Sequence, residues 1–181
     1  GMGAAGGTAT DIEGGFFDRL LLAPCRRPIL MLGPLGYSAL RSLIPTTLVL
    51  LLSIALGADM PGGVLGVVCL YVAAVGVALL FGTLGLAFVY TFRSLKSLSL
   101  VQIFIFAFMF LSIGQVPLAL QSGWLQRAAR LNPMTNIMRL SRQGFLGDVT
   151  WHGTWPGLVA IAALAGGFGA IAYRQLRRIV P

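Results

Sequence analysis

Long apolar runs separated by short charged segments divide the chain into four predicted membrane-crossing helices. A helix that spans the hydrocarbon core needs about 20 mainly apolar residues. Four runs meet this requirement, at residues 38–57, 63–90, 98–120 and 155–173. The pattern therefore predicts an all-α fold, a polytopic membrane helix bundle that forms a single transmembrane domain over residues 1–181.

Two residues interrupt the first run, and we expect neither to break it. Arg41 lies near the start of the predicted span, where its long side chain reaches the interface. Pro45 is tolerated where neighbouring groups satisfy the freed backbone. The preceding segment, residues 28–37 with the sequence PILMLGPLGY, is either an interfacial helix or an extension of the same span.

The long connection at residues 121–150 is amphipathic and is predicted to form two short helices against the outer surface. Trp124 lies on the apolar face of the first. In the second, Asn132 suits the N-cap, Pro133 the first helical position and Gly147 the end. The apolar face of this second helix is formed by Met134, Ile137, Met138 and Phe145, and Arg139 and Arg142 point away from it.

Composition identifies the class of protein and limits its partners. Hydrophobic residues make up 57% of the 181 residues and charged residues 10%, against about 25% charged in ordinary soluble domains. The chain is therefore an integral membrane protein. Its net charge of +8 is assigned to contacts with anionic membrane lipids, and no nucleic-acid partner is expected.

The distribution of Lys and Arg predicts that both ends of the chain are cytoplasmic. Three regions that share one side of a four-span protein carry eight basic residues: Arg19, Arg26, Arg27, Arg93, Lys96, Arg174, Arg177 and Arg178. The other side carries four, all in the long connection: Arg127, Arg130, Arg139 and Arg142. We interpret these four as interfacial, so the positive-inside rule favours the first side as cytoplasm.

The sequence contains no motif for covalent chemistry, so no catalytic residue, metal or cofactor is expected on this chain. It lacks GxxxxGK[ST], HExxH and CxxC patterns, and His152 is interpreted as interfacial. The polar residues Gln102, Ser112 and Gln115 lie within a predicted span and suit a substrate path or a subunit interface. All five acidic residues lie outside the spans, which disfavours proton coupling and indicates that the energy for any transport comes from a partner.

Glycines within the spans are interpreted as sites of close helix packing, with a substrate-induced hinge as the alternative. They fall in three groups, which are Gly62 with Gly66, Gly82 with Gly85, and Gly166 with Gly167 and Gly169.

The charged segment at residues 11–27, DIEGGFFDRLLLAPCRR, predicts a short amphipathic helix after a turn at Gly14 and Gly15. Phe16 pairs with Leu20 and Phe17 with Leu21 at helical spacing. Spacing alone leaves two interpretations open: an interfacial anchor for the first span, or a helix presented to a groove on a cytoplasmic partner.

Two stretches resemble the type-2 ABC exporter permeases, especially the daunorubicin-resistance-like subunits. ATDIEGGFFDRLLLAPCRRPILMLG, residues 9–33, is similar to the cytoplasmic loop of that family. FLSIGQVPLALQSGWLQRAARLNPMTNIMRLSRQGFLG, residues 110–147, is similar to its late segment. The two matches occur in the family's order with two predicted spans between them.

The resemblance implies a permease of a bacterial plasma membrane with six spans, of which the first two precede this N-terminally truncated piece. Residues 10–27 would then be the cytoplasmic coupling loop, and residues 121–150 an outer re-entrant hairpin that includes Trp124, Asn132 and Pro133. A separate ABC ATPase subunit would bind ATP and Mg²⁺, and a second permease, identical or different, would complete the exporter. The residues implied to dock on the ATPase are Glu13, Gly14, Phe16, Phe17, Asp18, Arg19, Leu20, Leu21 and Pro24.

Three functions are therefore compared. The favoured one is the membrane subunit of an ATP-driven exporter that moves amphipathic small molecules, lipids or glycans. The alternatives are a carrier driven by an ion gradient and a membrane scaffold that transports nothing.

Overall fold

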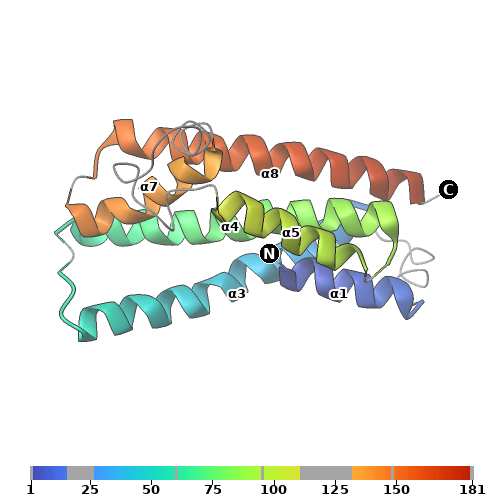
Figure 1. Cartoon of the computed structure of the whole chain (residues 1–181), viewed down its shortest axis with the longest axis horizontal. Helices are drawn as coiled ribbons and strands as arrows, with labels where there is room; N and C mark the ends of the chain where they lie inside the picture. The colour runs from blue at the N-terminus through green and yellow to red at the C-terminus, as the bar shows by residue number, and fades with distance from the viewer. Residues whose placement is uncertain are drawn as a thin grey trace. The chain divides into compact units, whose positions relative to one another are not determined.

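The regular structure of the chain is helical throughout the described part, which confirms the predicted all-α class (Figure 1). The computed structural model describes residues 2–15, 27–59, 61–94, 96–110, 132–147 and 149–179. Its helices are α1 (Met2–Glu13), α3 (Arg27–Ala55), α4 (Gly63–Phe92), α5 (Ser97–Phe110), α7 (Pro133–Leu146) and α8 (Trp151–Ile179).

Three of the described helices are long and apolar enough to cross a membrane, at Pro28–Ala55, Gly63–Phe92 and Trp151–Arg178. The apolar part of α5, Leu98–Phe110, is shorter, and residues 111–120 of that predicted span lie outside the described residues. The side chains at i, i+4 and i+8 on α3 show how these helices meet the bilayer. Ile44 is 65% exposed, Leu48 62% and Leu52 62%, so the described chain leaves this apolar stripe uncovered, as suits a helix that lies in a bilayer.

α3 begins at Arg27, so residues 28–37 are an extension of the first span and not a separate interfacial helix. Prolines and glycines are tolerated in membrane helices because neighbouring groups satisfy the backbone. As a result, Arg41 lies in the middle of α3, and the expectation that it lies near the start of the span is wrong. Its guanidinium donates to the Tyr37 hydroxyl at 3.2 Å and lies 5.9 Å from that ring's centre. The side chain therefore extends back along the helix toward its N-terminus.

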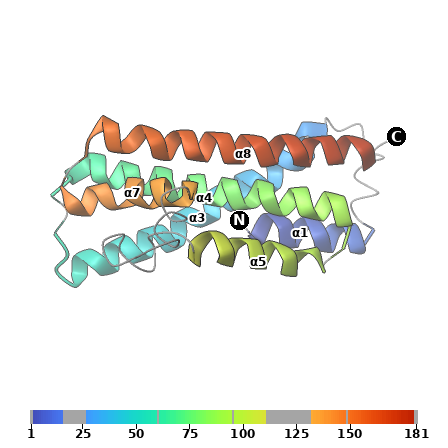
Figure 2. The ribbon, with the colours of Figure 1, turned by 45° about the horizontal axis from the view of Figure 1, so that its top comes forward.

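The first of two compact units comprises residues 1–41, 78–104 and 163–181. Its larger core cluster is built from α3, α4 and α8 and contains Leu35, Leu86, Ala87, Tyr90, Ala172 and Leu176. A second cluster joins Ala5 and Ala9 of α1 to Val89 of α4, with Leu98 of α5 packed against it (Figure 2). The contact between α1 and α4 is close because Gly85 has no side chain: a Cβ there would lie 2.6 Å from the Ala5 Cβ.

The second unit comprises residues 42–77 and 105–162. Here α4 and α7 approach each other through glycine, and a Cβ on Gly66 would lie only 2.3 Å from the Gly144 Cα. The Gly62 amide donates to the Gly144 carbonyl at 3.0 Å. α3 is joined to α4 by a hydrogen bond of 2.7 Å between the hydroxyls of Thr47 and Tyr71.

The three predicted groups of glycines differ in how closely they pack against other helices. The packing interpretation is confirmed for Gly62 and Gly66, for Gly82 beside Leu35, and for Gly85. At Gly166 and Gly167 a Cβ would meet nothing within 4 Å, so these two make no close packing contact within the described chain.

Candidate functional site

The sequence correctly predicted both ends of α7. Asn132 precedes the helix in an extended conformation, and its side-chain oxygen accepts from the Met134 amide at 2.9 Å. Pro133 occupies the first turn, and Gly147 closes the helix with a left-handed φ of 80°. The Asn132 amide group also donates to the Phe108 carbonyl at 2.9 Å. The cap residue therefore ties the start of α7 to α5 as well as starting the helix.

The other end of α7 is held by α4 and α8. The close contact at Gly144, described above, fixes it against α4. The buried side chain of Gln143 reaches the start of α8, where its oxygen accepts from the Thr150 amide and the Thr154 hydroxyl, both at 3.2 Å. A Cβ on Gly157 of α8 would lie 2.9 Å from the Leu140 Cβ. α7 is thus attached to three other helices of its unit.

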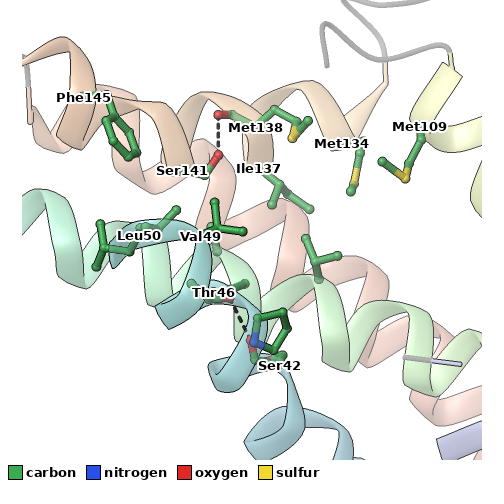
Figure 3. A pocket seen from close by; sticks show the side chains of 15 residues that line it. Ser42, Thr46, Val49, Leu50, Met109, Met134, Ile137, Met138, Ser141 and Phe145 are labelled. Carbon is green, nitrogen blue, oxygen red and sulfur yellow. Dashed lines mark hydrogen bonds between the residues drawn. The ribbon is translucent and has the colours of Figure 1, made fainter. Parts of the chain in front are cut away.

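Between α7 and its neighbours in the second unit lies a cavity of about 440 Å³. Such a volume falls within the range of about 300–1,000 Å³ that is typical of small-molecule sites. Residues from α3, α4, α5 and α7 line it: Ser42, Pro45, Thr46, Val49, Leu50, Leu70, Ala73, Ala74, Val77, Met109, Met134, Ile137, Met138, Ser141 and Phe145. Figure 3 shows Phe145 at one end and the thioethers of Met134 and Met109 at the other.

The lining is apolar apart from three hydroxyl-bearing residues, and it contains no charged side chain. The Thr46 hydroxyl donates to the Ser42 carbonyl at 2.7 Å, and the Ser141 hydroxyl donates to the Met138 carbonyl at 2.9 Å (Figure 3). Each of these oxygens keeps lone pairs that can accept a further hydrogen bond. Met side chains adapt to ligands of different shape because they are flexible and polarisable.

The cavity therefore suits the apolar part of a molecule, with room for one or two hydrogen-bond donors. An ionised group would lose its hydration there without gaining a partner charge. The lining residues include no His, Cys, Asp, Glu or Lys side chain. Among the described residues, no group of His, Cys, Asp and Glu is placed to hold a metal ion.

Comparison with known proteins identifies the family. The model of the family described as "ABC-2 family transporter protein" matches residues 1–174. The chain belongs to the ABC-2 transporter family. No curated protein and no solved structure matches it. The recognition from sequence is thus confirmed at the level of the family, and this ABC-2 permease is a membrane transport protein.

The structure places only part of the predicted docking set of the permease. Glu13 is the last residue of α1, and its carboxylate accepts a hydrogen bond from the Ser94 hydroxyl at 3.3 Å. Gly14 follows in a turn that includes Gly15, whose φ is 70°. The other members lie outside the described residues: Phe16, Phe17, Asp18, Arg19, Leu20, Leu21 and Pro24.

Of the three polar residues predicted for a substrate path, only Gln102 belongs to the described chain, and it is not among the residues that line the cavity. Gln102 is half-buried on α5 and belongs to the first unit, whereas every residue that lines the cavity belongs to the second. Ser112, Gln115 and Trp124 lie outside the described residues. Asn132 and Pro133 were predicted for the outer hairpin. They lie at the start of α7 and are not among the residues that line the cavity.

The sequence predicted no cavity, but it predicted the apolar face of α7 that forms one wall of it. The apolar face of α7 was predicted, and all four of its named residues line the cavity. The contributions of Ser42, Thr46 and Met109 were missed. The pair Ala73 and Ala74 in the apolar run of α4 was a signal for the position of the cavity, since small side chains leave space beside a helix.

Proposed function

We propose that this ABC-2 permease is the membrane subunit of an ATP-driven exporter that moves amphipathic molecules out of the cell. The observation that carries the proposal is the family match over residues 1–174. The exporter would contain a second permease subunit, identical or different, and an ABC ATPase that binds ATP and Mg²⁺. Both ends of the chain would be cytoplasmic in a bacterial plasma membrane.

The charge pattern of the long helices supports an external source of energy. Within the three candidate spans no residue is Asp or Glu. The described acidic residues are Asp11 and Glu13 in α1 and Asp59 after α3. Proton-coupled carriers normally use buried ionisable groups inside the membrane, so this pattern favours an ATPase partner over a proton gradient.

In the proposed mechanism, residues 13–24 dock on the ATPase, and the loop from Gly14 to Pro24 is the coupling helix. Phe16, Phe17, Leu20 and Leu21 are its apolar anchors, and Asp18 and Arg19 its polar contacts. When the ATPase subunits close on ATP, they would push this segment and tilt the spans that follow it, which switches access to the substrate site. The cavity beside α7 is the candidate place for the apolar part of the cargo.

The docking role is tested with the full-length permease and its ATPase. Changing Leu20→Asp and Leu21→Asp together should abolish co-purification and substrate-stimulated ATP hydrolysis, because charges replace two apolar anchors. The matched control, Leu20→Met with Leu21→Met, keeps both positions apolar and should retain both activities. Undiminished co-purification and hydrolysis by the Asp variant would reject the coupling role.

A further inference from the structure

A pocket of about 250 Å³ opens between α4 and α8 within the first unit. Aromatic side chains form much of its wall, Phe88 and Phe92 from α4 and Phe168 from α8. Among the described residues that line it, the one polar residue is Thr91, whose hydroxyl donates to the Ala87 carbonyl at 2.7 Å. The described chain leaves Phe92 exposed, so an apolar chain that entered the pocket would cover aromatic surface.

The pocket lies near the ends of two helices that run in the same direction. Leu86 and Tyr90 of α4 share a core cluster with Ala172 and Leu176 of α8, and the two helices lie side by side in both views of the ribbon (Figure 1, Figure 2). In each helix the residues that line the pocket occupy the last turns of the apolar sequence. In a bilayer this is the depth just below the lipid headgroups.

Basic side chains follow the pocket on α8. Arg178 comes seven residues after Ile171, which lines the pocket, so it lies on the same face of the helix about 10 Å further along the axis. Arg174 lies between them, and both arginines are exposed. The guanidinium of Arg177 lies 5.9 Å from the centre of the Tyr173 ring. Arg174 and Arg178 are therefore the residues best placed to bind a ligand that extends out of the pocket.

The acidic residues of the first unit lie on another side of α4. In the described part of the unit they are Asp11 and Glu13, both on α1. α1 packs on α4 at Gly85 and Val89, whereas Leu84 and Thr91 line the pocket. At 3.6 residues per turn these two pairs face in directions roughly 130° apart. The surroundings of the pocket are therefore positively charged and suit an anionic ligand.

We propose that the pocket and the two arginines form a binding site for one anionic phospholipid. The upper part of an acyl chain occupies the pocket, and Arg174 and Arg178 bind the phosphate. The membrane supplies this ligand at the required depth, because its phosphates lie directly above its acyl chains. Arg93 and Lys96, exposed just after α4, add positive charge at the same end, and such residues attract anionic lipid. The pocket turns this general attraction into a defined site, which does not depend on an ATPase partner.

The test measures binding of single phospholipids to the full-length permease in detergent by native mass spectrometry. Dioleoylphosphatidylglycerol should bind about tenfold tighter than dioleoylphosphatidylcholine, which has the same chains and no net charge. Arg174→Gln with Arg178→Gln should reduce this preference to less than about twofold. The matched control, Arg139→Gln with Arg142→Gln, removes two exposed arginines of α7 in the second unit and should keep the preference. Since all four arginines are exposed, both variants should melt at the wild-type temperature without added lipid.

A second pair of variants tests the pocket separately from the charge. Phe168→Ala removes part of the wall and should weaken binding of both lipids about fivefold, with the preference unchanged. The matched control, Phe106→Ala, removes the same side chain from an exposed position of α5 outside the pocket and should change binding less than about twofold.

Three results would overturn the inference by showing that the charges do not select the lipid: equal binding of the two lipids to the wild type, an undiminished preference in the α8 variant, or an equal loss in the α7 control. A loss in Phe168→Ala no greater than in Phe106→Ala would also overturn it, because the arginines would then attract lipid without a defined site.

Discussion

The contact between Gly66 of α4 and Gly144 of α7 gives a sharp prediction about what positions the cavity wall. Changing Gly66→Ala would place a Cβ 2.3 Å from the Gly144 Cα and 3.3 Å from its carbonyl carbon. Ordinary contact begins at 3.4 Å, and the obstacle is backbone, which cannot rotate away as a side chain can. The two helices must therefore separate, although the Gly62 amide is bonded to the Gly144 carbonyl.

The expected cost is about 1–3 kcal/mol, the usual effect of overpacking a well-packed contact. Alanine also favours helix over glycine by about 1 kcal/mol, which would hide part of this cost. Gly167→Ala in α8 is the matched control, because it gains the same propensity and its Cβ meets nothing within 4 Å. The difference in stability between the two variants is therefore the cost of the contact alone.

The assay is thermal unfolding of the purified permease in detergent, with binding of an apolar fluorescent probe as a second readout. Gly167→Ala should melt at or above the wild-type temperature. Gly66→Ala should melt several degrees below this control, at roughly 2–4 °C for each kcal/mol in a chain of this size. Its probe binding should also fall, since α7 carries one wall of the cavity. Equal melting temperatures for the two variants would refute the reasoning.

Three further variants test other parts of the second unit. Asn132→Ala removes both the cap and the bond to the Phe108 carbonyl. It should cost about 1–2 kcal/mol and speed hydrogen exchange in the first turn of α7, and unchanged exchange would contradict this role. Ala74→Phe should occupy the cavity and reduce probe binding by at least tenfold, with little change in the melting temperature; full binding would show that the probe sits elsewhere. Thr47→Val breaks the bond to Tyr71 and should cost about 0.6 kcal/mol, the average for such bonds between membrane helices, by the same melting assay. A stability equal to that of the wild type would mean that the bond does not stabilise the contact of α3 with α4.

The features that could be predicted from the sequence are those that depend on local chemistry. Asn132, Pro133 and Gly147 mark the ends of α7 because an N-cap, a proline in the first turn and a left-handed glycine each satisfy or spare backbone groups within a few residues. The apolar face of α7 was visible because polar residues alternate with it, as the exposed Arg139 and Arg142 show.

Features that depend on tertiary contacts could not be predicted. α4 is apolar all round, so its sequence has no periodic contrast to show which residues face a cavity and which face lipid. Glycines of similar sequence context differ in packing for the same reason: a Cβ on Gly66 would meet the backbone of another helix, whereas one on Gly167 would meet nothing within 4 Å in the described chain. The sequence left two alternatives open for the start of α3, because Pro28, Gly33 and Pro34 are helix breakers in water and are tolerated in a membrane. The docking role of residues 13–24 remains a prediction.

The central claim is that ATP hydrolysis on a partner subunit drives transport through this permease. The most direct measurement is flux of an amphipathic fluorescent substrate in vesicles that contain the full-length permease and its ATPase. The account predicts flux that requires ATP, persists when an uncoupler collapses the ion gradients, and is lost when Leu20 and Leu21 are both changed to Asp. Flux that survives ATP depletion and stops on addition of the uncoupler would contradict it and identify a gradient-driven carrier.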